Sequence, residues 1–270
     1  SERLHNIPTW NAAALWSAGS EFGEEQWKRA AKTYLDRIVE VQKKDGYWFE
    51  HTGPTTLYNL VYTHALGLHL FDEGEVDVSG ALDRAGAFHS RFVYPDGTLV
   101  SIVDGRVLYE GNKLTVIGLP GLLQAGAGLG YCRALAGSGK PFGPPSGNGA
   151  NFVPQVYRFL CEQPEVEVPD AKGAVPLDDG AAVHSCGDFT VVLSGILGTD
   201  DNRWGYDRLQ HIEVHHRKTG VVLGGGLSIG KEMAFIDSGG EYLARKASLE
   251  NDKRLLKLEY PRGKAAVSLA

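Results

Sequence analysis

The chain has 270 residues, of which 43% are hydrophobic and 22% charged, and this composition is typical of a globular protein with a substantial core. No uninterrupted apolar run is long enough to cross a bilayer as a helix, so we expect no membrane span. The formal net charge is −6 and no basic block occurs, which argues against nucleic acid as a partner.

The first half of the chain is predicted to be helical. Apolar residues recur at helical spacing over 24–41 and 55–71, a third helix is predicted from Ser79, as its N-cap, to Tyr94, and a fourth over 119–135. Asp45-Gly46 and Asp96-Gly97 each follow a helix and precede a short apolar stretch. This recurrence favours a helix-pair repeat of the kind found in α/α toroids, and the alternative is chance similarity of two turns.

The second half of the chain has a different pattern. Residues 137–149 are rich in Gly, Pro and Ser and predict a linker, which a short helix over 152–161 follows. Beyond it, four strands are predicted at 181–186, 189–194, 210–216 and 221–223. Helices followed by strands predict an α+β multidomain protein. We expect a helical segment over 1–137, a linker with a short helix over 138–175, and an antiparallel β-region over 176–270.

The densest group of residues suited to catalysis lies at 45–59, with the sequence DGYWFEHTGPTTLYN. It combines His51, Tyr58 and Asn59 in a loop that leads into a helix, and loops on a rigid scaffold often carry function. The alternative interpretation is that Tyr58 is a half-buried residue of the helix.

The run 45–59 resembles the aspartate-glycine, histidine and tyrosine stretch of chondroitin AC and hyaluronate lyases, although its spacing is shorter. Residues 177–226 are similar in order and texture to the β-region of heparinase II/III-like proteins. Both resemblances imply an (α/α) toroid, followed in the second case by an antiparallel β-sandwich-like region. They also imply a polysaccharide lyase that cleaves a uronic-acid-containing polysaccharide by β-elimination.

Such a reaction needs a base for the C5 proton, an acid for the C4 oxygen and a group that neutralises the uronate carboxylate. The resemblance implies that Tyr58 is the base or acid and His51 its partner. It implies that Asn6 is the carboxylate neutraliser, with Asn11 as the second choice. The alternative for Asn6 is a helix cap near Pro8.

Further candidates are polar or aromatic residues around these three, and one is a basic residue after a turn. We predict substrate contacts from His5, Trp10, Asn11, Asn59, Arg106 and His215.

A row of polar residues alternates along the strand predicted at 210–216. His211, Glu213 and His215 share one face, and if Ile212 and Val214 face the core, that row faces solvent or a cleft. The row could bind zinc, lend a histidine to the substrate, or be the polar outer face of a sheet. We predict no cofactor and no catalytic metal, and leave open a structural metal ion.

Two other functions remain open: a glycoside hydrolase on the same scaffold, with Glu50 and Asp45 as carboxylates, and a non-catalytic carbohydrate-binding relative. The resemblance implies a periplasmic or secreted protein, although the N-terminus has no signal-peptide pattern. The chain also starts without Met, in sequence typical of the interior of a domain, so we expect a fragment of a longer protein. The polysaccharide and the oligomeric state stay open.

Overall fold

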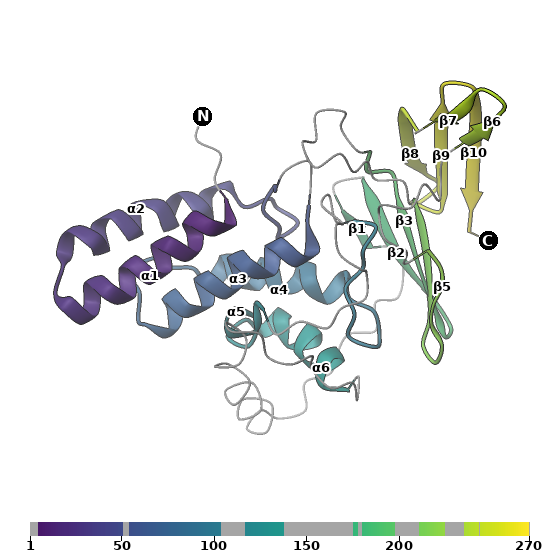
Figure 1. Ribbon diagram of the computed structural model, residues 1–270. Coiled ribbons are helices and arrows are strands. Elements are labelled where there is room, and N and C mark those ends of the chain that lie inside the picture. Colours follow the sequence, from purple (N-terminus) through teal and green to yellow (C-terminus); the bar gives the residue numbers. More distant parts are fainter. Residues whose placement is uncertain are drawn as a thin grey trace. The chain divides into compact units, whose positions relative to one another are not determined.

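The computed structural model describes residues 5–50, 54–103, 117–137, 175–177, 180–197, 211–224, 235–242 and 244–269. Helices precede antiparallel sheets along the chain, which confirms the predicted α+β class (Figure 1). The described residues form two compact units. The helical unit contains 5–50, 56–93 and 117–137, and the β unit contains 54–55, 94–103 and the residues from 175 onward. The β unit therefore takes 94–103 from inside the stretch that was predicted as one helical segment.

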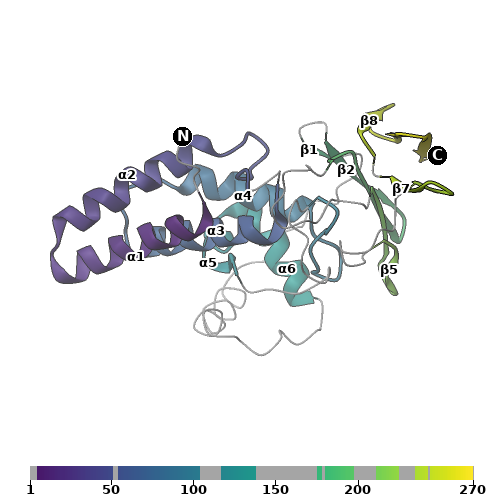
Figure 2. The same cartoon turned by 45° about the horizontal axis from the view of Figure 1, so that its top comes forward.

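The helical unit begins with a hairpin of α1 (Asn6–Phe22) and α2 (Glu25–Val41), which lie side by side in Figures 1 and 2. Gly23 ends α1 with a φ of 72°, a left-handed conformation that glycine adopts without strain. The prediction of α2 is confirmed, whereas α1 was not predicted. Its buried face explains this, because it is composed largely of small and polar side chains: Asn6, Thr9, Ala12, Ala13, Trp16 and Gly19.

Two more helices complete the core of this unit, α3 (Thr56–Phe71) and α4 (Ser79–Arg91). The predicted N-cap is wrong: Val78 is the N-cap of α4, and the Ser79 N–H donates to Asp77 Oδ1 at 3.1 Å. Helix α4 also ends three residues before the predicted Tyr94. The core is a set of buried apolar side chains from these helices and the turns between them: Ala12, Leu35, Ile38, Trp48, Tyr62, Leu66, Val76, Val78, Ala81, Leu82, Ala85 and Ala125.

The helix predicted over 119–135 is broken into three pieces: α5 (Leu119–Leu122), the 3-10 turn η1 (Gly126–Gly128) and α6 (Leu129–Gly137). Glycines allow the backbone of these pieces to approach neighbouring backbone closely. A Cβ on Gly121 would lie 2.2 Å from the Thr63 carbonyl oxygen, and one on Gly128 would lie 2.4 Å from the Leu122 carbonyl oxygen. The apolar pattern was helical, but the glycines let the backbone turn between the pieces.

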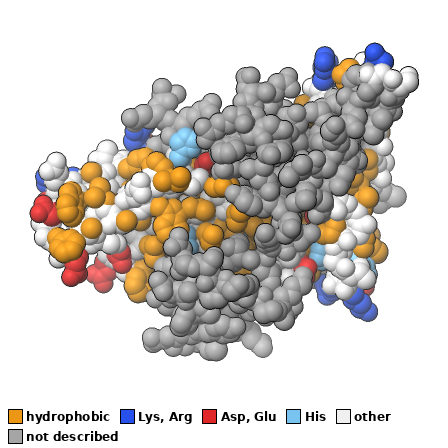
Figure 3. Space-filling view, viewed as in Figure 1, with side chains coloured by type: hydrophobic (Ala, Val, Ile, Leu, Met, Phe, Trp, Pro, Cys, Tyr) orange, Lys and Arg blue, Asp and Glu red, His pale blue; other side chains and the backbone are white. Residues whose placement is uncertain are grey.

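The helical unit also exposes apolar side chains, which gather over it in Figure 3. The large hydrophobic residues exposed in its described part are Ile7, Phe22, Trp27, Val41, Phe49 and Phe71. None of the described helices is both long and apolar enough to cross a membrane.

The β unit contains an antiparallel sheet in the order β1-β2-β3-β4-β5. Its strands are β1 (Val175–Leu177), β2 (Ala181–Cys186), β3 (Phe189–Ser194), β4 (Ile212–His216) and β5 (Gly220–Leu223), so the four predicted strands are confirmed. Two smaller antiparallel sheets follow, one of β6 (Phe235–Asp237) and β7 (Gly240–Tyr242), the other of β8 (Lys246–Glu250), β9 (Leu255–Tyr260) and β10 (Gly263–Ser268). Leu193 of β3 packs with Leu256 and Leu258 of β9 in the apolar core of the unit.

Candidate functional site

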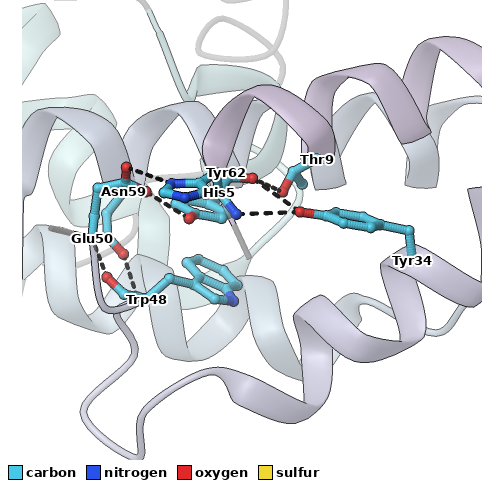
Figure 4. Close-up of polar contacts among 7 residues, drawn as sticks. All are labelled: His5, Thr9, Tyr34, Trp48, Glu50, Asn59 and Tyr62. Atoms are coloured by element: carbon cyan, nitrogen blue, oxygen red, sulfur yellow. Dashed lines mark hydrogen bonds and ion pairs between the residues drawn. The ribbon is translucent and has the colours of Figure 1, made fainter. Parts of the chain in front are cut away.

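The backbone of His5 is fixed at the start of α1. His5 is the N-cap residue, and its N–H donates to the Tyr34 hydroxyl at 3.3 Å (Figure 4). The Tyr34 hydroxyl in turn donates to the His5 carbonyl oxygen at 3.2 Å, and Thr9 Oγ1 donates to the same oxygen at 2.9 Å. Two helices therefore hold the main chain from which the imidazole projects.

The side chain of His5 faces a buried carboxylate. Its Nδ1 lies 3.4 Å from Glu50 Oε1, and the Tyr62 hydroxyl donates to Glu50 Oε2 at 2.7 Å. Burial, and then the charge of Glu50, raise the pKa of Tyr62 well above its usual range, so the phenol keeps its proton and acts as the donor. The Glu50 side chain is 1% exposed and that of His5 is 43% exposed, so the imidazole is the member of this group that solvent and ligands can reach.

The segment before Glu50 is held by α3. Asn59 Oδ1 accepts from the Trp48 N–H at 2.6 Å, and its amide nitrogen donates to the Trp48 carbonyl oxygen at 3.1 Å. The Trp48 ring stacks on Tyr62, with 5.1 Å between ring centroids, and its Nε1 donates to the Ile38 carbonyl oxygen at 2.8 Å. Residues 48–50 therefore contact α3 through Asn59 and Tyr62, and α1 through His5.

The residues predicted to be catalytic are only partly described. Asn6 is buried and begins α1 directly after His5, and Tyr58 is half-buried in the first turn of α3, directly before Asn59. His51, and Arg106 among the predicted substrate contacts, lie outside the described residues.

The other predicted substrate contacts of the helical unit have different environments. Trp10 stacks on His64 with 4.8 Å between ring centroids, whereas Asn11 is exposed on α1. His64 Nδ1 accepts from the Gly118 N–H at 3.2 Å, and burial lowers the pKa of His64 to about 4. Asn59 is fully buried, and its side-chain amide bonds the backbone N–H and carbonyl oxygen of Trp48. This is a structural role, and its contact with substrate stays a prediction.

The polar row of β4 faces the opposite way to the orientation considered from sequence. His211, Glu213 and His215 are 2%, 0% and 1% exposed, while Ile212 and Val214 are only half-buried. The alternation was right, but the polar side chains occupy the more deeply buried face. The sequence could not show this, because the residues that contact Glu213 and His215 come from 94–103, far away in the chain.

Those contacts all lie within the β unit. Ser101 Oγ donates to Glu213 Oε2 at 2.9 Å, Tyr94 stacks on His215 with 4.4 Å between ring centroids, and Asp96 Oδ1 lies 3.4 Å from His215 Nε2. Burial raises the pKa of Glu213, against the effect of its hydrogen bonds. Within the part of the chain that the structure describes, no three His, Cys, Asp or Glu residues are arranged to hold a metal ion.

Sequence reasoning did not identify Tyr62 or Tyr34, and it considered Glu50 only as a hydrolase carboxylate. A signal for Tyr62 was available, because it follows Tyr58 by four positions and shares its side of the predicted helix. No comparable signal marks Tyr34, which lies on a separate helix far from 45–59. In the structure Glu50 is engaged by Tyr62 and His5, which does not favour its use as a free hydrolytic acid.

Comparison of the sequence with models of protein families gives no match. Comparison with curated proteins gives no match either.

Proposed function

We propose that the chain belongs to a polysaccharide lyase similar to the heparinase II/III-like proteins, which cleaves a uronic-acid-containing polysaccharide by β-elimination. Under this proposal the helices form part of an (α/α) toroid and the sheets part of a β-sandwich-like region. The exposed hydrophobic side chains of the helical unit support the toroid, because stacked helical hairpins would cover such a face (Figure 3). A polysaccharide substrate also favours a periplasmic or secreted location.

The observation that carries the proposal is the way residues 48–50 join two helices. Glu50 contacts His5, which directly precedes Asn6, and Trp48 is bonded to Asn59, which directly follows Tyr58. The beginnings of α1 and α3, where four of the predicted site residues lie, are thus tied to one short segment (Figure 4). This supports a common site at the starts of the two helices.

The proposed chemistry uses groups available there. Tyr58, as its phenolate, takes the C5 proton of the uronate, the electrons of that bond form the C4–C5 double bond, and the C4–O bond breaks. The same phenol then returns the proton to the leaving oxygen. Asn6 binds the uronate carboxylate, whose negative charge grows as the C5 proton leaves, and His5 binds a sugar hydroxyl. Elimination adds no water, whereas a hydrolase would need two carboxylates that flank the bond.

The test is ultraviolet absorbance during incubation with alginate, hyaluronan, chondroitin, heparan sulfate and ulvan, each assayed in parallel for reducing ends. We expect absorbance to rise with one of them, since the new double bond is conjugated to the carboxylate. Tyr58→Phe is expected to remove at least about 10²-fold of the activity, and Tyr260→Phe on β9 serves as the matched control. New reducing ends without absorbance would establish a hydrolase instead, and full activity of Tyr58→Phe would exclude the assigned base.

A further inference from the structure

We propose that Glu50 is a positioning residue that sets the tautomer of His5, with the ring proton on Nδ1 and Nε2 turned toward the ligand. The role of Nε2 in binding a sugar rests on the function proposed above. The tautomer itself is a property of the free protein and is measured without a substrate.

The hydrogen-bond capacity of the three side chains leads to this assignment. An ionised carboxylate only accepts hydrogen bonds. The Tyr62 hydroxyl donates to Glu50 Oε2, and Oε1 is the oxygen that faces His5 Nδ1. Nδ1 must therefore be the donor. In a neutral imidazole the proton then resides on Nδ1, and Nε2 is left as an acceptor.

The surroundings fix both ends of this contact. Tyr34 and Thr9 hold the backbone of His5, so the ring turns mainly about its own side-chain bonds. Tyr62 holds the far oxygen of Glu50, and Asn59 holds the main chain two residues before it. The only partly exposed side chain of the Glu50–Tyr62–His5 group is that of His5. A buried carboxylate that orients a half-exposed imidazole is an arrangement that enzymes use to direct one ring nitrogen at a substrate.

Replacing Glu50 by glutamine gives a sharp expectation, because the amide has one accepting oxygen and one donating NH₂ group. The pKa of Tyr62 is raised by burial, so its hydroxyl stays a donor and binds the amide oxygen. The NH₂ group then faces His5 Nδ1, which has to accept. The ring proton moves to Nε2, and the tautomer inverts with almost no change in side-chain volume.

The experiment is ¹⁵N nuclear magnetic resonance of the histidine rings in the full chain at a pH where His5 is neutral, with His5→Gln used to assign the signals. We expect wild type to show protonated Nδ1 and Glu50→Gln to show protonated Nε2. Adding Tyr62→Phe to Glu50→Gln removes the donor that orients the amide, and we expect the Nδ1 form to reappear in part. Glu25→Gln is the matched control, because Glu25 pairs with Lys28 at the other end of the α1–α2 hairpin.

A wild-type His5 ring protonated on Nε2 overturns the inference. An unchanged tautomer in Glu50→Gln, with the backbone amide spectrum of the folded chain retained, overturns it as well.

Activity separates this inference from the proposed function. If wild type is a lyase, Glu50→Gln is expected to lower kcat/KM by about 10²- to 10⁴-fold with a changed pH profile, as when an orienting carboxylate is lost, while Glu25→Gln retains both. If the tautomer inverts but no polysaccharide is cleaved by wild type, the lyase proposal fails and the positioning role stands. If a polysaccharide is cleaved but the wild-type proton is on Nε2, the positioning role fails and the lyase stands.

Discussion

The helical unit and the β unit both bury titratable groups, and some of these have pKa values that shift in opposite directions. Burial lowers the pKa of His64 to about 4 and that of His89 to about 3, and both belong to the helical unit. In the β unit, burial raises the pKa of Glu213. The helical unit therefore holds bases that folding keeps uncharged, and the β unit holds an acid that folding tends to keep protonated.

These shifts give His64 and His89 a response to pH opposite to that of Glu213. The unfolded chain binds a proton at His64 and His89 below pH 6.5, whereas the folded chain does so only near pH 4 and 3, so acid lowers their contribution to the unfolding free energy. For Glu213 the folded chain binds the proton more tightly, so its contribution falls as the pH rises above 4.5. Partly buried His184 in the β unit shifts in the same direction as the helical histidines, so single variants are the appropriate test.

The comparison requires that each unit has its own core. The variant Trp48→Ala tests this, and of the predictions made here it has the largest expected effect. Trp48 is 1% exposed, stacks on Tyr62 and donates to the Ile38 carbonyl oxygen. Its loss is expected to lower the unfolding free energy of the helical unit by about 3–5 kcal/mol. Hydrogen exchange should then accelerate in α1–α4 and remain slow in the strands around Leu193 and Leu256. Trp27→Ala, at a position 39% exposed, is the control and should cost much less. Equal acceleration in both units would contradict separate cores.

His89→Phe sharpens the comparison on the helical side. His89 is fully buried, and neither of its ring nitrogens has a hydrogen-bond partner among the described residues. Because burial lowers the pKa of His89 to about 3, this residue alone makes the unfolding free energy of wild type about 2 kcal/mol smaller at pH 5 than at neutral pH. Denaturant unfolding at a series of pH values should show that His89→Phe removes this loss.

The control for this prediction is Tyr131→Phe. The Tyr131 ring lies edge-on to His89 with 5.9 Å between centroids, and burial raises the pKa of this phenol, so it does not titrate in acid. The variant should shift the unfolding free energy by a similar amount at every pH. If the unfolding free energy of His89→Phe depends on pH as steeply as that of wild type, the folded chain binds a proton at His89 in the same pH range as the unfolded chain does.

The fold could be predicted from the sequence where periodicity was strong. The apolar spacing of α2 and the alternation of β2 and β3 were sufficient because each pattern is local. Helix α1 lacked such a pattern, since Ala12, Ala13 and Gly19 carry little apolar surface. The glycines of 119–137 allowed backbone contacts that no periodicity reveals. Asp45-Gly46 and Asp96-Gly97 are both turns, with glycine φ values of 91° and 80°, but they belong to different units.

The candidate site could be predicted only in its local part. The sequence indicated 45–59 because its polar and aromatic residues are contiguous. It could not indicate that Glu50 faces His5 or that Tyr34 holds His5, because these contacts join residues 45 and 29 positions apart. For the β4 row, alternation identifies two faces but carries no information on which of them a distant segment will cover.

Glu213→Gln sharpens the comparison on the β side, with the smallest expected effect. The amide can still accept from Ser101 Oγ, which lies 2.9 Å from Glu213 Oε2, but it carries no charge. Because burial raises the pKa of Glu213, we expect a gain in unfolding free energy at neutral pH and none well below pH 4.5.

Glu250→Gln on β8 is a control of the opposite sign. The hydrogen bond from Lys257 Nζ lowers the pKa of Glu250, so this exposed pair contributes stability above pH 4.5 that is lost as the pH falls. Denaturant unfolding of both variants across the same pH range should give difference curves of opposite slope. If the two curves slope the same way, the folded β unit does not hold the proton of Glu213 more tightly than the unfolded chain does, because its hydrogen bonds then outweigh the effect of burial.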